Sequence, residues 1–144
     1  MLWNDSLEIG FEVIDKQNND LIARVEAMMY AESSKERLAQ FETFEKIVEN
    51  YFEREQAIHR ICNFFDSEKH KQSHEVYLKM LKRVKKNLTE EGATLESENI
   101  FRKNTFEYLK KHILCHDQLF GFFCQDDMIH KGITTQYRVV PSFV

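Results

Sequence analysis

Glycine and proline are scarce in this sequence, contributing only four and one of its 144 residues. Their usual combined share is about 12%, and β-sandwiches and β-barrels need them for turns and bulges, so an all-β fold is nearly excluded. No apolar run approaches the roughly 18 residues of a membrane span. The N-terminal stretch is acidic and does not have the pattern of a signal peptide.

The sequence also lacks paired cysteines and an excess of positive charge. Its three cysteines form no C-x-x-C pair, which argues against a disulfide framework or a zinc ribbon and suits a reducing compartment. Acidic residues outnumber basic ones by 24 to 20, so nucleic-acid binding has no electrostatic basis. We therefore expect one cytoplasmic domain over residues 1–144, without nucleic-acid or membrane partners. Three residues are expected to be buried packing cysteines: Cys62, Cys115 and Cys124.

Apolar residues at helical spacing mark four amphipathic segments. In chain order the expected helices run from an N-cap at Asp15 to residue 30, from about Lys35 to about Asn63, from Asp66 or Ser67 to about Leu88, and from near Ser97 as far as Phe123. Residues 2–14 are expected to form an extended arm, and residues 130–144 a tail with His130 exposed. Segments of this length with short connections predict an all-α, antiparallel up-and-down four-helix bundle with an extended N-terminal arm.

Histidine and carboxylate side chains recur at helical spacing. His70 and His74 lie one turn apart and can bind one metal ion, although on that helix alone an exposed pair is the plainer interpretation. His112 and Asp117 are five residues apart, so a reaching carboxylate or a local π-type widening is needed to bring them to one point. His116 lies one turn from His112 and is an alternative to it.

The second helix offers a further candidate ligand, because Tyr51, Glu55 and His59 follow one another at four-residue intervals. A carboxylate in an apolar core costs several kcal/mol unless it is paired or binds a metal. Glu55 is therefore a candidate ligand, unless it lies at the wet edge of the apolar stripe. Three helices thus offer histidine or carboxylate groups to the interior, an arrangement that binds redox metals in helical bundles.

These segments resemble the hemerythrin family, especially its single-domain bacterial members, over nearly the whole chain. The resemblance rests on Trp3, the stretch IGFEVIDKQ at 9–17, Phe52-x-x-Glu55-Gln56, His70-x-x-x-His74 and Leu109-x-x-His112-Ile113-x-x-x-Asp117. The family binds two iron ions through five histidines and two bridging carboxylates. Carried over, the resemblance implies three imidazoles on one iron and two bridging carboxylates, namely His70, His74 and His112, and Glu55 and Asp117.

The family's two other histidines, which bind the oxygen-binding iron, are replaced here by Asn18 and Tyr51, and its usual tryptophan ahead of the fourth-helix histidine is Tyr108. Three outcomes are open. The site holds two irons with Tyr51, as phenolate, and His59 as new ligands; or it holds one metal ion; or it holds none. Three imidazoles and two carboxylates in one core favour a metal, because a cation neutralises the carboxylates.

The replaced ligands imply a changed function. The family binds dioxygen reversibly, whereas a phenolate ligand stabilises ferric iron and discourages oxygen release. We expect a hemerythrin-like non-haem iron-binding protein that reacts with dioxygen or peroxide, or acts as a sensor, rather than a reversible oxygen carrier. The alternatives are an oxygen-binding bacteriohemerythrin with replaced ligands, a peroxide-consuming enzyme, and a metal-free interaction module that retains the fold.

Overall fold

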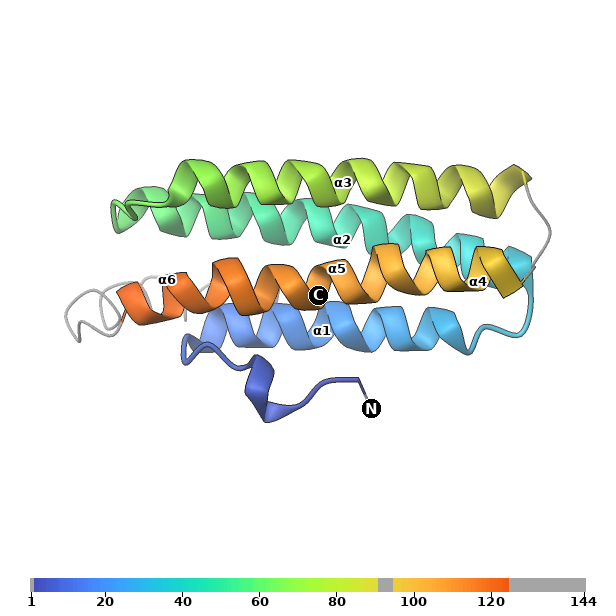
Figure 1. The fold of residues 1–144 in the computed structure, drawn as a ribbon, viewed down its shortest axis with the longest axis horizontal. Coiled ribbons are helices and arrows are strands. Elements are labelled where there is room, and N and C mark those ends of the chain that lie inside the picture. Colours follow the sequence, from blue (N-terminus) through green and yellow to red (C-terminus); the bar gives the residue numbers. More distant parts are fainter. Residues whose placement is uncertain (1, 91–94, 125–144) are drawn as a thin grey trace.

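The computed structural model of the chain describes residues 2–90 and 95–124. These residues form an antiparallel bundle of four helices (Figure 1), and no strand occurs among them, which confirms the predicted fold class. The elements are a 3₁₀ turn at Asp5–Leu7, α1 at Glu12–Met29, α2 at Ser34–Ile61, α3 at Ser67–Glu90, α4 at Leu95–Arg102, α5 at Tyr108–His112 and α6 at Gln118–Phe123. Within the described ranges, no helix has both the length and the hydropathy to cross a bilayer.

The fourth helix of the bundle, residues 95–123, is one continuous rod with two π-helical turns in it. These turns span Lys103–Glu107 and Ile113–Asp117 and join α4 to α5 and α5 to α6. The rod lies beside α1 in Figure 1 and packs on α3 as well. Each π turn inserts a residue into the helical spiral and so rotates the following side chains relative to a regular α-helix.

The first helix begins earlier than the sequence predicts. α1 begins at Glu12, with Phe11 at the N-cap position, so Asp15 does not cap it and residues 12–14 are helical. The Asp15 carboxylate instead accepts hydrogen bonds from the backbone N–H groups of Ile9 (2.8 Å) and Gly10 (3.1 Å). The predicted N-cap is therefore wrong, because this carboxylate ties the arm to the first turn of α1. Its charge still suits the positive end of the helix dipole.

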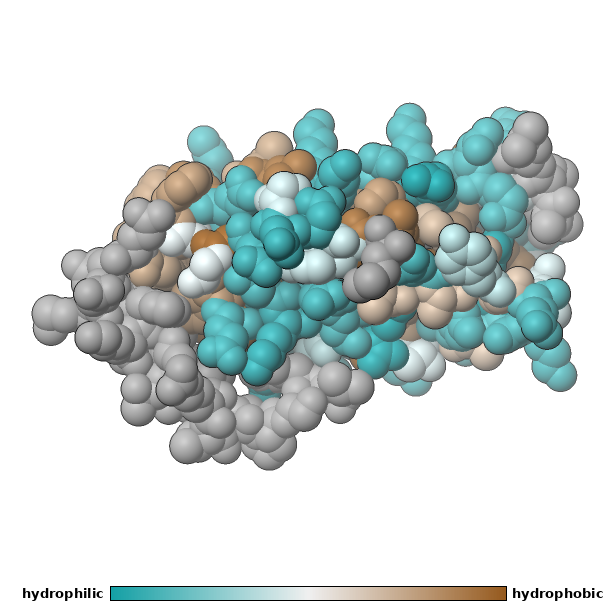
Figure 2. All heavy atoms as spheres, turned by 90° about the horizontal axis from the view of Figure 1, so that it is seen from below, coloured by the Kyte–Doolittle hydropathy of each residue, from teal (hydrophilic) through white to brown (hydrophobic). Residues whose placement is uncertain are grey.

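Apolar side chains from all four helices fill the bundle interior. Leu21, Phe44, Leu81 and Leu109 are each at most 1% exposed and come from α1, α2, α3 and α5 in turn. A second apolar cluster occupies the end of the bundle where α2 turns into α3. The face of the molecule seen in Figure 2 is largely hydrophilic, with apolar side chains gathered only in small areas. This division between interior and surface is what the amphipathic periodicity predicts.

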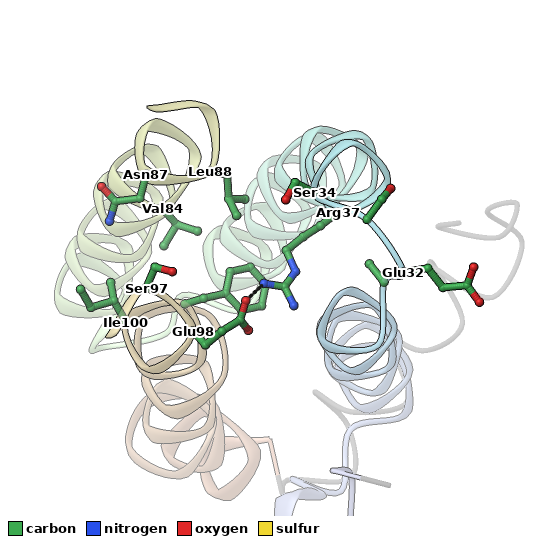
Figure 3. A pocket seen from close by; sticks show the side chains of 12 residues that line it. Glu32, Ser34, Arg37, Val84, Asn87, Leu88, Ser97, Glu98 and Ile100 are labelled. Carbon is green, nitrogen blue, oxygen red and sulfur yellow. Dashed lines mark hydrogen bonds and ion pairs between the residues drawn. The ribbon is translucent and has the colours of Figure 1, made fainter. Parts of the chain in front are cut away.

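Arg37 fastens the opposite end of the bundle, where α1 turns into α2. Its guanidinium donates hydrogen bonds to the carbonyl oxygens of Met28 (3.0 Å) and Met29 (3.4 Å) and pairs with Glu98. It also lies 4.9 Å from the centre of the Phe101 ring. Figure 3 shows Arg37 and Glu98 reaching towards each other across a pocket of about 190 Å³. Since α1 has no basic residue in its last turn, Arg37 supplies the charge that its C-terminus favours.

The cysteine prediction is only partly correct. Cys124 is buried and Cys62 is half-buried, but Cys115 is exposed. Cys115 lies in the π turn Ile113–Asp117. This turn places the side chains of His112 and Asp117 in the interior and that of Cys115 on the outer side. The predicted exposure of His130 and the predicted tail fall outside the described residues.

The arm crosses α6 at Gly121, where a Cβ atom would collide with the backbone carbonyl oxygen of Ile9. On helix propensity alone, Gly121→Ala should stabilise the protein by about 1 kcal/mol. We predict the opposite sign, a loss of about 1–3 kcal/mol, because the arm must move away. Urea unfolding followed by circular dichroism measures the change. Phe122→Ala, at a side chain that is 66% exposed on the same helix, is the control and should change stability by less than about 0.5 kcal/mol.

Candidate metal centre

Five of the seven predicted ligand candidates meet in the core of the bundle. Each offers one nitrogen or oxygen atom, these atoms all lie within 4.8 Å of one another, and all five residues are buried: Glu55, His70, His74, His112 and Asp117. We call these five residues the histidine–carboxylate cluster. It is the kind of donor set that binds a transition-metal ion in helical bundles.

Helix geometry brings these residues together. His70 and His74 are one turn apart on α3, so both rings point into the bundle. His112 ends α5, and the π-helical turn Ile113–Asp117 follows it directly. A π turn closes after about five residues, so it brings Asp117 under His112, which is one of the two solutions that their spacing allowed. His116 stays outside the cluster, with its ring centre 5.4 Å from that of His112.

Three imidazole Nε2 atoms converge on two carboxylate oxygens. His70 Nε2 lies 2.5 Å from Glu55 Oε1 and 2.9 Å from Asp117 Oδ1. His112 Nε2 is 3.0 Å from the same Asp117 oxygen, and His74 Nε2 is 3.6 Å from the same Glu55 oxygen. The Nε2 atoms of His70 and His112 are 3.2 Å apart. Three nitrogens and two oxygens therefore face one small volume.

Two of the imidazoles are held from behind. His74 Nδ1 lies 3.1 Å from the side-chain oxygen of Gln56, which can only accept, so Nδ1 carries the proton and Nε2 presents a lone pair to the cluster. The His74 ring also stacks on Phe52, with centres 3.8 Å apart. His112 Nδ1 lies 2.7 Å from Ser73 Oγ. Such outer partners fix the orientation and tautomer of metal-binding histidines.

These outer partners, Ser73 and Gln56, are not evident from the sequence. Ser73 is a small polar residue three positions after His70, on the ligand-bearing side of α3, and Gln56 follows Glu55 directly. A polar residue at these spacings is only a weak signal, because the partner histidine of Ser73 lies on another helix.

The electrostatics of the cluster depend on His70. Burial lowers the pKa of His70, but the Glu55 and Asp117 carboxylates have the larger, opposite effect and raise it to about 10. Burial likewise raises the pKa of Glu55, yet the charge of the adjacent His70 brings it well below its ordinary value. Burial lowers the pKa of His74 to about 4. At neutral pH the two carboxylates are therefore charged, and one imidazolium neutralises part of that charge.

A metal ion fits this donor set better than hydrogen bonds alone do. Glu55 Oε1, Asp117 Oδ1 and His74 Nε2 are buried and, among the described residues, have no hydrogen bond of normal geometry despite their close neighbours. Each such group costs about 1–3 kcal/mol. Coordination to one cation would satisfy all three at once. Mixed imidazole and carboxylate donors suit ions such as iron.

Asn18 and Tyr51, the two residues that the sequence resemblance placed at histidine positions, are engaged in hydrogen bonds. The side-chain amide of Asn18 donates to Asp117 Oδ2 at 2.9 Å. The Tyr51 hydroxyl donates to Asp20 Oδ2 at 2.8 Å, and the same oxygen accepts from Arg24 at 2.9 Å. Burial and the Asp20 carboxylate raise the pKa of Tyr51 above its ordinary value. The Tyr51 hydroxyl is thus protonated and directed at Asp20.

His59 lies next to the cluster without belonging to it. Its Nε2 is 3.7 Å from Glu55 Oε1, and its ring centre is 4.4 Å from that of His70. The rings of Phe64 and Phe120 lie against it, at 5.1 and 4.5 Å. Neither ring nitrogen has a hydrogen-bond partner in the described part of the chain, and burial lowers the pKa of His59 to about 4. His59 is thus a neutral buried imidazole with available nitrogens.

The chain is similar to known proteins of one kind. It is 26% identical over 124 residues to the bacteriohemerythrin of Stenotrophomonas maltophilia, covering 84% of this chain and 79% of that protein. It is 24% identical over 112 residues to the myohemerythrin of Theromyzon tessulatum, covering 76% of this chain and 91% of that protein. A bacteriohemerythrin of Pseudomonas paraeruginosa is 27% identical over 82 residues, which is 55% of this chain and 54% of that protein. No family model and no solved structure matches the chain.

The similarity is consistent with the geometry. The alignments with the first two relatives cover most of this chain, and the bundle places the histidine–carboxylate cluster in its core. The five candidate ligand residues are therefore supported by the sequence motifs and also by their proximity in the bundle core. The chain is thus similar in sequence to bacteriohemerythrins and a myohemerythrin, and its four-helix bundle contains a potential metal-binding cluster.

Proposed function

We propose that the chain binds one non-haem iron ion at the histidine–carboxylate cluster and works as a redox-responsive iron protein, not as a reversible oxygen carrier. Dioxygen or peroxide is the proposed small-molecule reactant. The observation that carries this proposal is the hydrogen bond from Asn18 to Asp117, since it uses the carboxylate oxygen that a second ion would need.

Asn18 supports a single ion on chemical grounds. A carboxylate that bridges two metal ions gives one oxygen to each. In this chain Asp117 Oδ1 faces His70 and His112, while Oδ2 accepts the Asn18 amide. An amide NH₂ group has no lone pair to offer a metal. At a position where the family has a histidine ligand, this chain thus has Asn18, whose amide donates a hydrogen bond to the Asp117 carboxylate.

Tyr51 supports the same interpretation. A phenolate ligand would require loss of the hydroxyl proton, which Asp20 accepts in a hydrogen bond at 2.8 Å. Removing that proton would place a phenolate against a carboxylate, which is why the pKa of Tyr51 is raised by its burial and by Asp20. We therefore propose that Tyr51 stays protonated and supports the bundle at this position, in place of the ligand role that the sequence suggested.

We propose that His59 is a reserve ligand for the same ion and not for a second one. It follows Glu55 by one turn, on the side away from Tyr51, and its ring lies against His70. Its neutral ring and its nitrogens without hydrogen-bond partners suit coordination. A small approach towards Glu55 would add a sixth donor to three imidazoles and two carboxylates.

One iron ion changes the chemistry that this bundle can support. Bound iron would supply a one-electron step between its ferrous and ferric states, half of what an iron pair supplies. The chain's own residues hold the charge and limit access of water: Glu55 and Asp117 balance the cation, Phe52 stacks on His74, and Phe120 lies against the neighbouring His59. Two carboxylates favour the more highly charged ferric state. These properties suit the sensing of oxidants or the handling of iron better than oxygen transport.

Iron content tests the ligand set. After iron-replete expression, we predict about one iron per chain by mass spectrometry, and an affinity loss of about 100-fold or more for His74→Ala and His112→Ala, because each removes a nitrogen donor. His116→Ala is the matched control, on the same helix as His112, and should keep its iron. Less than about 0.2 iron per chain in the wild type would contradict a metalloprotein and favour a metal-free interaction module.

Restoring the two replaced histidines tests the number of ions. The double variant Asn18→His, Tyr51→His removes the hydrogen bonds to Asp117 and Asp20 and supplies two imidazoles. We predict that its iron content rises from about one to about two per chain. The single variant Asn18→Ala, which frees Asp117 without adding a ligand, should stay near one. Two irons per chain in the wild type would overturn the proposal.

A further inference from the structure

Two of the three cysteines lie together at the end of the bundle nearest the candidate metal centre. Cys62 directly follows α2, and its N–H donates to the Ile58 carbonyl at 3.1 Å; Cys124 directly follows α6, and its N–H donates to Phe120 at 2.9 Å. Both belong to the same apolar cluster, in which Cys124 is 4% exposed and Cys62 is half-buried. These cap hydrogen bonds hold the two thiol-bearing residues at fixed positions, 62 residues apart in sequence.

The aromatic side chains around these cysteines are tightly packed. The Phe64 ring centre lies 5.0 Å from that of Phe120 and 5.1 Å from that of Phe123. The Phe64 N–H donates to the His59 carbonyl at 2.9 Å, and the Cys62 thiol lies 3.6 Å from the same oxygen. The turn after α2 and the end of α6 are thus packed together, with Cys62 against the apolar cluster that contains Cys124.

The two thiols also differ in character. They share a hydrogen bond, which lowers the pKa of Cys62 and raises the pKa of Cys124. Since Cys62 is also the more exposed of the two, it is the better nucleophile, while Cys124 suits the role of the second thiol that completes a disulfide. Cys115 is exposed, lies outside this apolar cluster and provides an internal comparison.

We propose that Cys62 and Cys124 form a reversible disulfide when the protein meets a peroxide. The Cys62 thiolate attacks one peroxide oxygen, the O–O bond breaks, and a sulfenic acid and one water result once a proton is taken up. The Cys124 thiol then attacks that sulfur, the S–S bond forms, the S–O bond breaks, and a second water leaves. In total two thiols lose two electrons and two protons, and the peroxide becomes two waters.

This bond would join the ends of α2 and α6 beside His59. Because Phe64 and Phe120 pack against the His59 ring, the disulfide would fasten the apolar cover on this side of the histidine–carboxylate cluster. The disulfide does not depend on bound iron, so it can form whether or not the proposed iron site is correct. Its expected effect is higher stability, since it closes a long loop in the unfolded chain.

Thiol mapping tests the proposal on the full chain. The reduced protein is treated with hydrogen peroxide, or with diamide as an oxidant that needs no metal, and then alkylated and analysed by mass spectrometry. We expect the intact mass before alkylation to fall by two hydrogens. After alkylation, only Cys115 should carry the label, and digestion should yield a peptide that links Cys62 to Cys124. Dithiothreitol should reverse the change, and the thermal midpoint of the oxidised form should be higher by about 5–10 °C.

Matched variants separate this bond from other oxidation. Cys115→Ser should still form the intramolecular link, whereas Cys62→Ser should not. Because Cys62 is only half-buried, the serine variant should fold, and its circular dichroism spectrum checks this. Three alkylated thiols after oxidation, a link that includes Cys115, or stable over-oxidation of Cys62 with Cys124 still reduced would each overturn the proposal.

Discussion

Two carboxylates and three imidazoles share one buried volume in this bundle, and the rest of the structure is arranged to balance their charge. In the protein alone the balance falls to His70, whose pKa rises to about 10 because Glu55 and Asp117 outweigh its burial. Ser73 and Gln56 hold two other rings, so that their inner nitrogens point at the carboxylates. Without a cation these buried carboxylates and imidazoles cost free energy that a bound metal ion would recover, and this is the physical basis for the proposed iron site.

The side of the cluster that faces α1 is built differently. At the two positions where the sequence resemblance expects histidine, Asn18 donates to Asp117, and Tyr51 donates to Asp20, which Arg24 also contacts. The Asn18 amide and the Tyr51 hydroxyl each have a protein partner, in contrast to Glu55 Oε1 and Asp117 Oδ1, which face the three imidazoles. The asymmetry supports one ion, and with it a protein whose redox step involves one electron. The Cys62 and Cys124 thiols, at the end of the bundle nearest the cluster, would add a second, separate response to oxidants.

Much of the fold could be predicted from the sequence because helix periodicity depends on local spacing. The stripes of apolar residues predicted four helices, and the five-residue offset between His112 and Asp117 indicated a π turn or a reaching carboxylate. Local spacing could not show which hydrogen-bond partner a polar side chain would have. Asp15 was predicted to cap its own helix but binds the arm, and the partners of Asn18, Tyr51 and Ser73 lie on other helices, where the rotation of each helix decides contact.

The proposal that the chain binds one iron ion is tested by electron paramagnetic resonance of the iron-loaded, oxidised protein. A single ferric ion among three imidazoles and two carboxylates has unpaired electrons with no neighbouring ion to cancel them. A single-iron site predicts a high-spin ferric signal that integrates to about one spin per chain and includes all the bound iron. Two ferric ions joined by carboxylates couple antiferromagnetically. A protein that holds about two irons per chain and gives almost no signal would contradict the account.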